Sequence, residues 1–177
     1  RYTTIMPLSL VMFLSMVKDA YEDYKRHKQD AEMNSSNAVV LRDGQWTNIA
    51  WRDVAVGDLV KLDKGDQFPA DLIIVSSAEA EGLCYVETSS LDGETNLKIR
   101  KSCQQLYDIF DSARPERLDC TFEYEAPNNR LYTFDGFYEK ANASARGGAI
   151  KVPLNADNVL LRGADLRNTP EAIGIVL

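Results

Sequence analysis

Short segments in which apolar and polar residues alternate follow one another from Asn37 to the end of the chain. Successive side chains of a strand point to opposite faces, so this alternation predicts strands with one buried face. Asp43-Gly44 separates two such segments, and this dipeptide is typical of a β-hairpin turn. Short strands at near-regular spacing predict a mainly β domain, a distorted jelly roll or β-sandwich. We expect strands at 38–42, 45–49, 58–62, 72–76, 84–88, 119–125, 131–138, 150–153 and 159–162, and a short helix at 104–112.

The beginning of the chain has a different pattern. Ile5 to Val17 carries no charge, but it is shorter than the roughly 20 residues with which a helix crosses hydrocarbon. A buried core helix, the apolar part of a signal peptide and the inner end of a membrane span that starts before Arg1 are all compatible with this run. Lys25, Arg26 and Lys28 follow it, and positive residues beside a span favour the cytosolic side.

These patterns predict three parts. The first, 1–17, holds the uncharged run, the second, 18–36, reads as an exposed charged helix that ends in a hinge at Asn34-Ser35-Ser36, and the third, 37–177, is the β domain. Residues 141–149 are small and polar and are expected to form a flexible insertion. The chain begins with Arg1 and ends in an apolar run, from which we expect a fragment of a longer membrane protein.

The composition argues against several classes of function. Lys and Arg number 20 and Asp and Glu 27, which gives a net charge of −7; a nucleic-acid partner would need a basic face. Cys84, Cys103 and Cys120 form no C-x-x-C pair, so neither a disulfide framework nor a zinc site is predicted. His27 is the only histidine, which argues against a Ser-His-Asp or Cys-His site. Glycine-rich nucleotide-binding motifs are also missing from the sequence.

The most pointed candidate site is the stretch Leu91-Asp92-Gly93-Glu94-Thr95-Asn96, which follows the strand expected at 84–88. Asp-Gly favours a tight turn, because glycine adopts backbone angles denied to other residues. Glu94 is therefore expected at the tip of a loop, where its carboxylate could enter another domain's site and accept a proton from an attacking water. Thr95 and Asn96 could donate hydrogen bonds to phosphate oxygens or hold the loop. Taken alone, such a stretch is more often an ordinary surface turn.

Four blocks in this order resemble the P-type ATPases, and within them the lipid-flippase branch, type IV. They are VGDLVKLDKGDQFPADLIIVSS, CYVETSSLDGETNLKIRK, EAPNNRLYTFDG and VPLNADNVLLRGADLRNT. The resemblance covers nearly the whole chain. By this resemblance, 1–17 would be the inner end of the second transmembrane helix, 18–36 its cytosolic stalk helix and hinge, and 37–177 the actuator domain. Most P-type ATPases carry T-G-E-S in the actuator loop, whereas the flippase branch has D-G-E-T, as Asp92 to Thr95 do here.

The resemblance implies a role for each residue of this loop. Glu94 would activate the water that hydrolyses a phospho-aspartate of the phosphorylation domain, and Asp92, Gly93, Thr95 and Asn96 would support the loop and the phosphate. ATP and Mg²⁺ would bind in phosphorylation and nucleotide domains outside this chain, so the isolated chain is expected to have no ATPase activity. The cycle would move a phospholipid to the cytosolic leaflet, with an accessory glycoprotein subunit as a further partner.

Two other classes remain open from the sequence. A membrane-tethered β-sandwich interaction module would use Glu94 as a plain turn residue. A secreted domain behind a signal peptide would carry glycans at Asn34 or Asn142, since both begin N-x-S sequons.

Overall fold

The computed structural model describes residues 2–110, 114–115, 118, 120–126, 128, 130–140 and 150–177, so the expected insertion at 141–149 lies outside the described residues. Two compact units are present. The first comprises Arg1–Asn37 with Ala50–Arg52, and the second comprises Ala38–Ile49 with Asp53–Leu177. The second unit holds the candidate loop.

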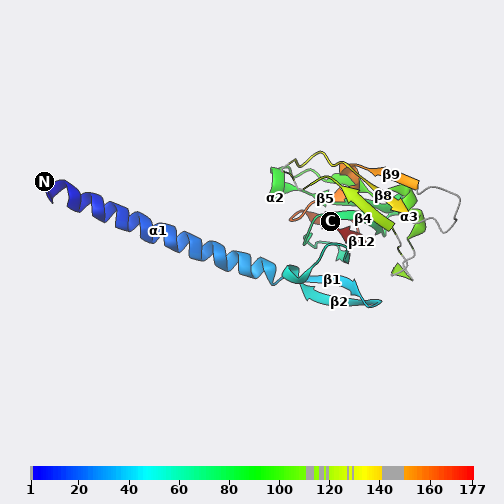
Figure 1. Ribbon diagram of the computed structural model, residues 1–177, viewed down its shortest axis with the longest axis horizontal. Helices are drawn as coiled ribbons and strands as arrows, with labels where there is room; N and C mark the ends of the chain where they lie inside the picture. The colour runs from blue at the N-terminus through cyan, green and yellow to red at the C-terminus, as the bar shows by residue number, and fades with distance from the viewer. Residues whose placement is uncertain are drawn as a thin grey trace. The chain divides into compact units, whose positions relative to one another are not determined.

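The first unit is built on one long helix, α1 (Tyr2–Asn34), drawn in blue in Figure 1. Its described side chains, from Ile5 onward, are exposed. No helix among the described residues contains a stretch apolar enough to count as a candidate membrane span. The helix ends where Asn34-Ser35-Ser36 was expected to break it, and the Ser36 carbonyl accepts a hydrogen bond from the Trp51 amide at 2.9 Å. The assignment of 1–17 to a membrane and of 18–36 to a stalk stays a prediction.

The second unit contains three antiparallel sheets (Figure 1). The largest has six strands in the order β10-β4-β12-β3-β1-β2. Its strands are β1 (Asn37–Arg42), β2 (Gln45–Ala50), β3 (Leu59–Asp63), β4 (Leu72–Ser77), β10 (Val159–Leu160) and β12 (Glu171–Val176). The predicted hairpin between β1 and β2 is confirmed: Asp43 has φ 51° and Gly44 φ 74°, the pair of positive values that a type I′ turn requires.

Two three-stranded sheets complete the unit. One has the order β11-β5-β6, from Asp165–Arg167, Leu83–Glu87 and Lys98–Lys101. The other has the order β7-β8-β9, from Cys120–Tyr124, Gly136–Lys140 and Ile150–Leu154. The helical turns of this unit are η2 (Ala80–Gly82), α2 (Ser89–Asp92), α3 (Gln104–Ile109) and η4 (Ala156–Asn158), whereas η1 (Trp51–Asp53) falls mostly in the first unit.

The core joins the large sheet to the β7-β8-β9 sheet. One buried cluster takes side chains from β3, β4 and β12 on one side and from β8, β9 and α3 on the other. Its members are Leu59, Ile73, Val75, Leu106, Tyr138, Val152, Leu154 and Ile173. Two sheets that pack face to face through a shared buried cluster form a sandwich. The mainly β prediction is therefore confirmed.

The structure differs from the predicted strands at several places. Residues 131–135 do not continue the strand: β8 begins at Gly136, and Leu131 and Tyr132 lie in an exposed loop. The strands β6, β11 and β12 were not predicted. The missed β12 pairs with both β3 and β4. Because a central strand can be buried on both faces, its apolar run shows no alternation to detect.

The buried position of β4 leads to a stability prediction. Leu72 is fully buried, whereas Leu131 is 36% exposed. Leu72→Ala should lower the free energy of unfolding by about 2–5 kcal/mol, because it removes transfer energy and leaves a cavity. The matched change Leu131→Ala should cost clearly less, about 1 kcal/mol, because this side chain is only partly removed from water. Denaturant unfolding followed by circular dichroism measures both, and equal losses would contradict the assigned core.

Candidate functional site

The candidate loop connects two paired strands. Strand β5 ends at Glu87 and β6 begins at Lys98, and the two are antiparallel, with Val86 opposite Lys98. The connection contains the single turn α2, labelled at one end of the β-rich unit in Figure 1, and then the residues from Gly93 to Leu97. Asp92 to Asn96 therefore lie at the end of a two-stranded ribbon, which is the loop position expected from the sequence.

Gly93 reverses the chain direction after α2. Its φ is 76° and its ψ 1°, a left-handed conformation, and its amide donates to the Ser89 carbonyl at 3.1 Å. A Cβ at this position would meet no atom within 4 Å, so the need for glycine is one of backbone angle and not of space. The special backbone geometry expected at Gly93 is confirmed.

Asp92 is the most highly bonded side chain of the loop. Its carboxylate accepts the Glu94 amide at 2.9 Å and the Tyr132 hydroxyl at 3.1 Å. The Thr88 hydroxyl lies 3.0 Å from both carboxylate oxygens, and the Lys98 ammonium completes the set. The side chain of Asp92 is only 9% exposed, so these donors replace most of the water that an ionised carboxylate would otherwise bind.

The same contacts shift the pKa values of the group. The Lys98 ammonium, followed by the Glu94 amide, holds the pKa of Asp92 well below its usual range. The Asp92 carboxylate in turn raises the pKa of Lys98. The hydrogen bond to Asp92 also raises the pKa of the Tyr132 hydroxyl. Asp92 is therefore ionised and Lys98 and Tyr132 are protonated at neutral pH.

Glu94 has a different environment from Asp92. Its side chain is 57% exposed, and its carboxylate lies 3.1 Å from the Lys98 ammonium. Thr95 and Asn96 are also exposed. Of the five residues predicted as a site, the structure joins Asp92 and Glu94 in one network, whereas the Gly93 amide bonds to the Ser89 carbonyl. Within the part of the chain that the structure describes, the side chains of Thr95 and Asn96 form no hydrogen bond, and their predicted roles toward phosphate stay predictions.

Sequence reasoning missed the residues that anchor this loop. Lys98 and Tyr132 belong to the Asp92 network. The hydroxyl of Ser90 donates to the Gly163 carbonyl at 2.7 Å and attaches α2 to the turn before β11. The Glu87 carboxylate accepts Ser89 at 2.8 Å and Arg167 at 2.7 Å. The only sequence signal for Lys98 is that a lysine follows two acidic residues of the motif closely.

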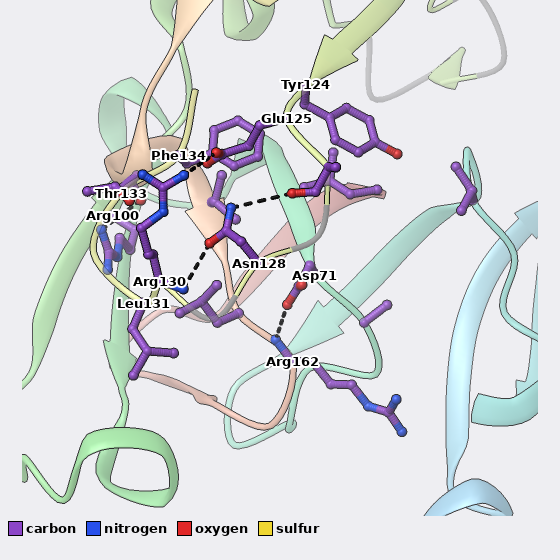
Figure 2. A pocket seen from close by; sticks show the side chains of 17 residues that line it. Asp71, Arg100, Tyr124, Glu125, Asn128, Arg130, Leu131, Thr133, Phe134 and Arg162 are labelled. Atoms are coloured by element: carbon purple, nitrogen blue, oxygen red, sulfur yellow. Dashed lines mark hydrogen bonds and ion pairs between the residues drawn. The ribbon is translucent and has the colours of Figure 1, made fainter. Parts of the chain in front are cut away.

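A second candidate is a cavity of about 470 Å³ in the same unit (Figure 2). Apolar side chains such as Phe134 and Leu161 line it together with three arginines. Arg100 lies 3.3 Å from Asp157, Arg130 lies 2.9 Å from Glu125, and the Arg162 amide donates to Asp71 at 2.7 Å. Two of the three guanidinium groups are thus ion-paired within the chain, and Arg162 contributes its main-chain amide to the bond with Asp71.

No group of three or more His, Cys, Asp or Glu among the described residues could hold a metal ion. The paired Asp92 and Glu94 carboxylates share the Lys98 ammonium instead.

Comparison with known proteins gives a consistent family. The profile of the P-type ATPase actuator domain matches residues 32–122. A phospholipid-transporting ATPase of Schizosaccharomyces pombe is 46% identical over 100% of this chain and 14% of its own length. Phospholipid-transporting ATPase IC of Mus musculus and ATPase ID of Homo sapiens are each 42% identical over 99% of the chain and 14% of their own lengths.

The chain thus spans 14% of the length of these relatives. Among solved structures, a zinc-transporting PIB-type ATPase aligns with 83% of this chain and 14% of its own chain at 16% identity. Its TM-score is 0.43, a likeness too slight to bear on the fold.

The lowered pKa of Asp92 predicts how the stability of the fold depends on pH. A carboxylate whose pKa is lower in the folded than in the unfolded chain stabilises the folded state at pH values above its unfolded pKa, near 3.9. This stabilisation is lost as the pH falls from there through the pKa of the folded state. The difference in melting temperature between wild type and Asp92→Asn should therefore be constant above about pH 5 and shrink below about pH 4. Thermal melts across this range measure it.

Asp135→Asn is the matched control. Asp135 is exposed, and within the described residues its carboxylate accepts no hydrogen bond. Its substitution should change the melting temperature little at any of these pH values. If the difference in melting temperature between wild type and Asp92→Asn stayed unchanged into strong acid, the ionised Asp92 network would be contradicted.

Proposed function

Because this chain belongs to the P-type ATPases and forms their actuator domain, we propose that its Glu94 activates the water that hydrolyses a phospho-aspartate in another domain of the full-length protein. The observation that carries the proposal is the contrast within the loop. Asp92 is enclosed by donors, whereas the Glu94 carboxylate stands exposed two residues further on, with Lys98 as its partner. A base that serves another domain must be accessible in this way.

The reaction requires a base and an aligned water. The water oxygen attacks phosphorus, the bond between phosphorus and the aspartyl oxygen breaks, and the water proton passes to the Glu94 carboxylate. The products are inorganic phosphate and a free aspartate. Holding the water in line with the leaving oxygen supplies much of the rate. With the base on a separate domain, hydrolysis depends on how the two domains are placed, which suits a conformational cycle.

The relatives support a proposal for the transported substrate. Their names describe phospholipid transport, and we extend this to the full-length protein as movement of a phospholipid to the cytosolic leaflet. The family implies the use of ATP and Mg²⁺, which we place in the phosphorylation and nucleotide domains. We further propose that 1–17 is the inner end of a membrane helix, that 18–36 is its stalk, that the β-rich unit lies in the cytosol, and that an accessory glycoprotein subunit is a partner.

The alternative, a tethered interaction module in which Glu94 is a plain turn residue, makes the opposite prediction for Glu94. The exposed ion pair with Lys98 would then serve only to hold a surface turn, and loss of the carboxylate would leave the phosphorylation cycle unchanged.

The test uses the full-length ATPase. Glu94→Gln should still form the phosphoenzyme from ATP, but its decay should slow by about 10²–10⁴-fold, the usual contribution of a general base. Pulse–chase phosphorylation with labelled ATP measures the decay rate. Glu123→Gln, an exposed glutamate on β7 without a described partner, is the control and should decay at the wild-type rate. Decay of Glu94→Gln as fast as wild type would refute the role of Glu94.

A further inference from the structure

A tyrosine from a distant part of the chain reaches the candidate loop. Tyr132 lies between β7 and β8, forty residues after Asp92, and its hydroxyl donates to Asp92 Oδ2 at 3.1 Å. We propose that Tyr132 is a positioning residue for Glu94 that acts through the Asp92 carboxylate. The inference rests on the role proposed for Glu94 and adds a residue outside the D-G-E-T motif to the same site.

Apart from Thr88, the two oxygens of the Asp92 carboxylate have different partners. Oδ1 accepts the Glu94 amide at 2.9 Å, whereas Oδ2 accepts the Tyr132 hydroxyl and the Lys98 ammonium. A carboxylate held at Oδ2 from outside the loop cannot rotate freely about its own axis. Tyr132 therefore keeps Oδ1 directed at the amide of Glu94 and fixes the backbone from which the Glu94 side chain extends.

Tyr132 also contacts the cation that the two carboxylates share. The Lys98 Nζ atom lies 5.0 Å from the centre of the Tyr132 ring, within the range of a cation–π interaction. The same ammonium is 3.1 Å from Glu94. Tyr132 thus touches both groups that determine where Glu94 lies, Asp92 through its hydroxyl and Lys98 through its ring.

The segment that carries Tyr132 is closed at its base. The Glu125 carboxylate accepts the Arg130 guanidinium at 2.9 Å, drawn as a dashed line in Figure 2, and the Asp135 amide at 3.3 Å. The Glu125 amide donates to the Asp135 carbonyl at 3.0 Å. One glutamate therefore ties together the two ends of the segment 130–135. Tyr132 extends from a closed turn, so it can hold Asp92 from a defined point of the β7-β8 sheet.

Tyr132 would affect catalysis through the position of the Glu94 carboxylate. The catalysed step is sensitive to the position of the base, and small displacements reduce the rate strongly. Loss of the Tyr132 hydroxyl leaves Lys98 and Thr88 on Asp92, so the loop should loosen without unfolding. The effect should be confined to the step that uses Glu94.

The first experiment is Tyr132→Phe in the full-length ATPase. Phosphoenzyme formation from ATP should be unchanged, and its decay should slow on the order of tenfold, the lower end of what loss of one hydrogen bond to a charged group costs. Tyr124→Phe is the matched control: the Tyr124 ring stacks on Phe134, and its hydroxyl has no partner among the described residues. Its decay should equal that of wild type. Wild-type decay in Tyr132→Phe would overturn the proposal.

The second experiment asks whether Tyr132 acts through Asp92. If it does, the double variant Asp92→Asn with Tyr132→Phe should decay no more slowly than Asp92→Asn alone, because the two residues share one interaction. Independent, multiplicative effects would overturn the proposal. Glu94→Gln is measured in parallel: slow decay there with wild-type decay in Tyr132→Phe rejects only the positioning role, whereas fast decay in Glu94→Gln rejects the proposed function itself.

Discussion

The requirement to compensate a mostly buried carboxylate organises the candidate site. Asp92 keeps its charge in a place with little water, and ionised groups in such places must be supplied with donors. The donors come from three parts of the chain: Thr88 before the turn, the Glu94 amide and Lys98 after it, and Tyr132 from another sheet connection. The loop geometry is therefore a consequence of satisfying one side chain.

Two carboxylates two residues apart thus have different environments. Asp92 is saturated with hydrogen bonds and held ionised, which suits a structural group. Glu94 is exposed and retains one ion pair, which suits a group that exchanges partners. When two neighbouring carboxylates differ in exposure and hydrogen bonding in this way, they commonly have different roles. Lys98 bridges both and keeps the net charge of the three groups at −1, which limits the repulsion between the acids.

Local signals predicted the features that have local causes. The β1-β2 hairpin was predicted because Asp43-Gly44 favours positive φ at both positions, and the loop tip was predicted because Gly93 follows Asp92. The hydrogen bond from Tyr132 to Asp92 could not be predicted, since nothing near Tyr132 in sequence indicates a contact with Asp92. Its segment even alternates like a strand, but Glu125 closes residues 130–135 into a turn. Strand β12 was missed for a related reason: burial between β3 and β4 removes the alternation.

The position of β12 in the large sheet affects how the domain is made. This strand comes from residues 171–176, yet it pairs with β3 and β4, which lie about a hundred residues earlier. During synthesis β3 and β4 leave the ribosome long before the strand that separates them, and until then their facing edges have no partner. Unpaired edges of this kind are where nascent chains aggregate. The domain therefore completes its central sheet only after residues 171–176 have been translated.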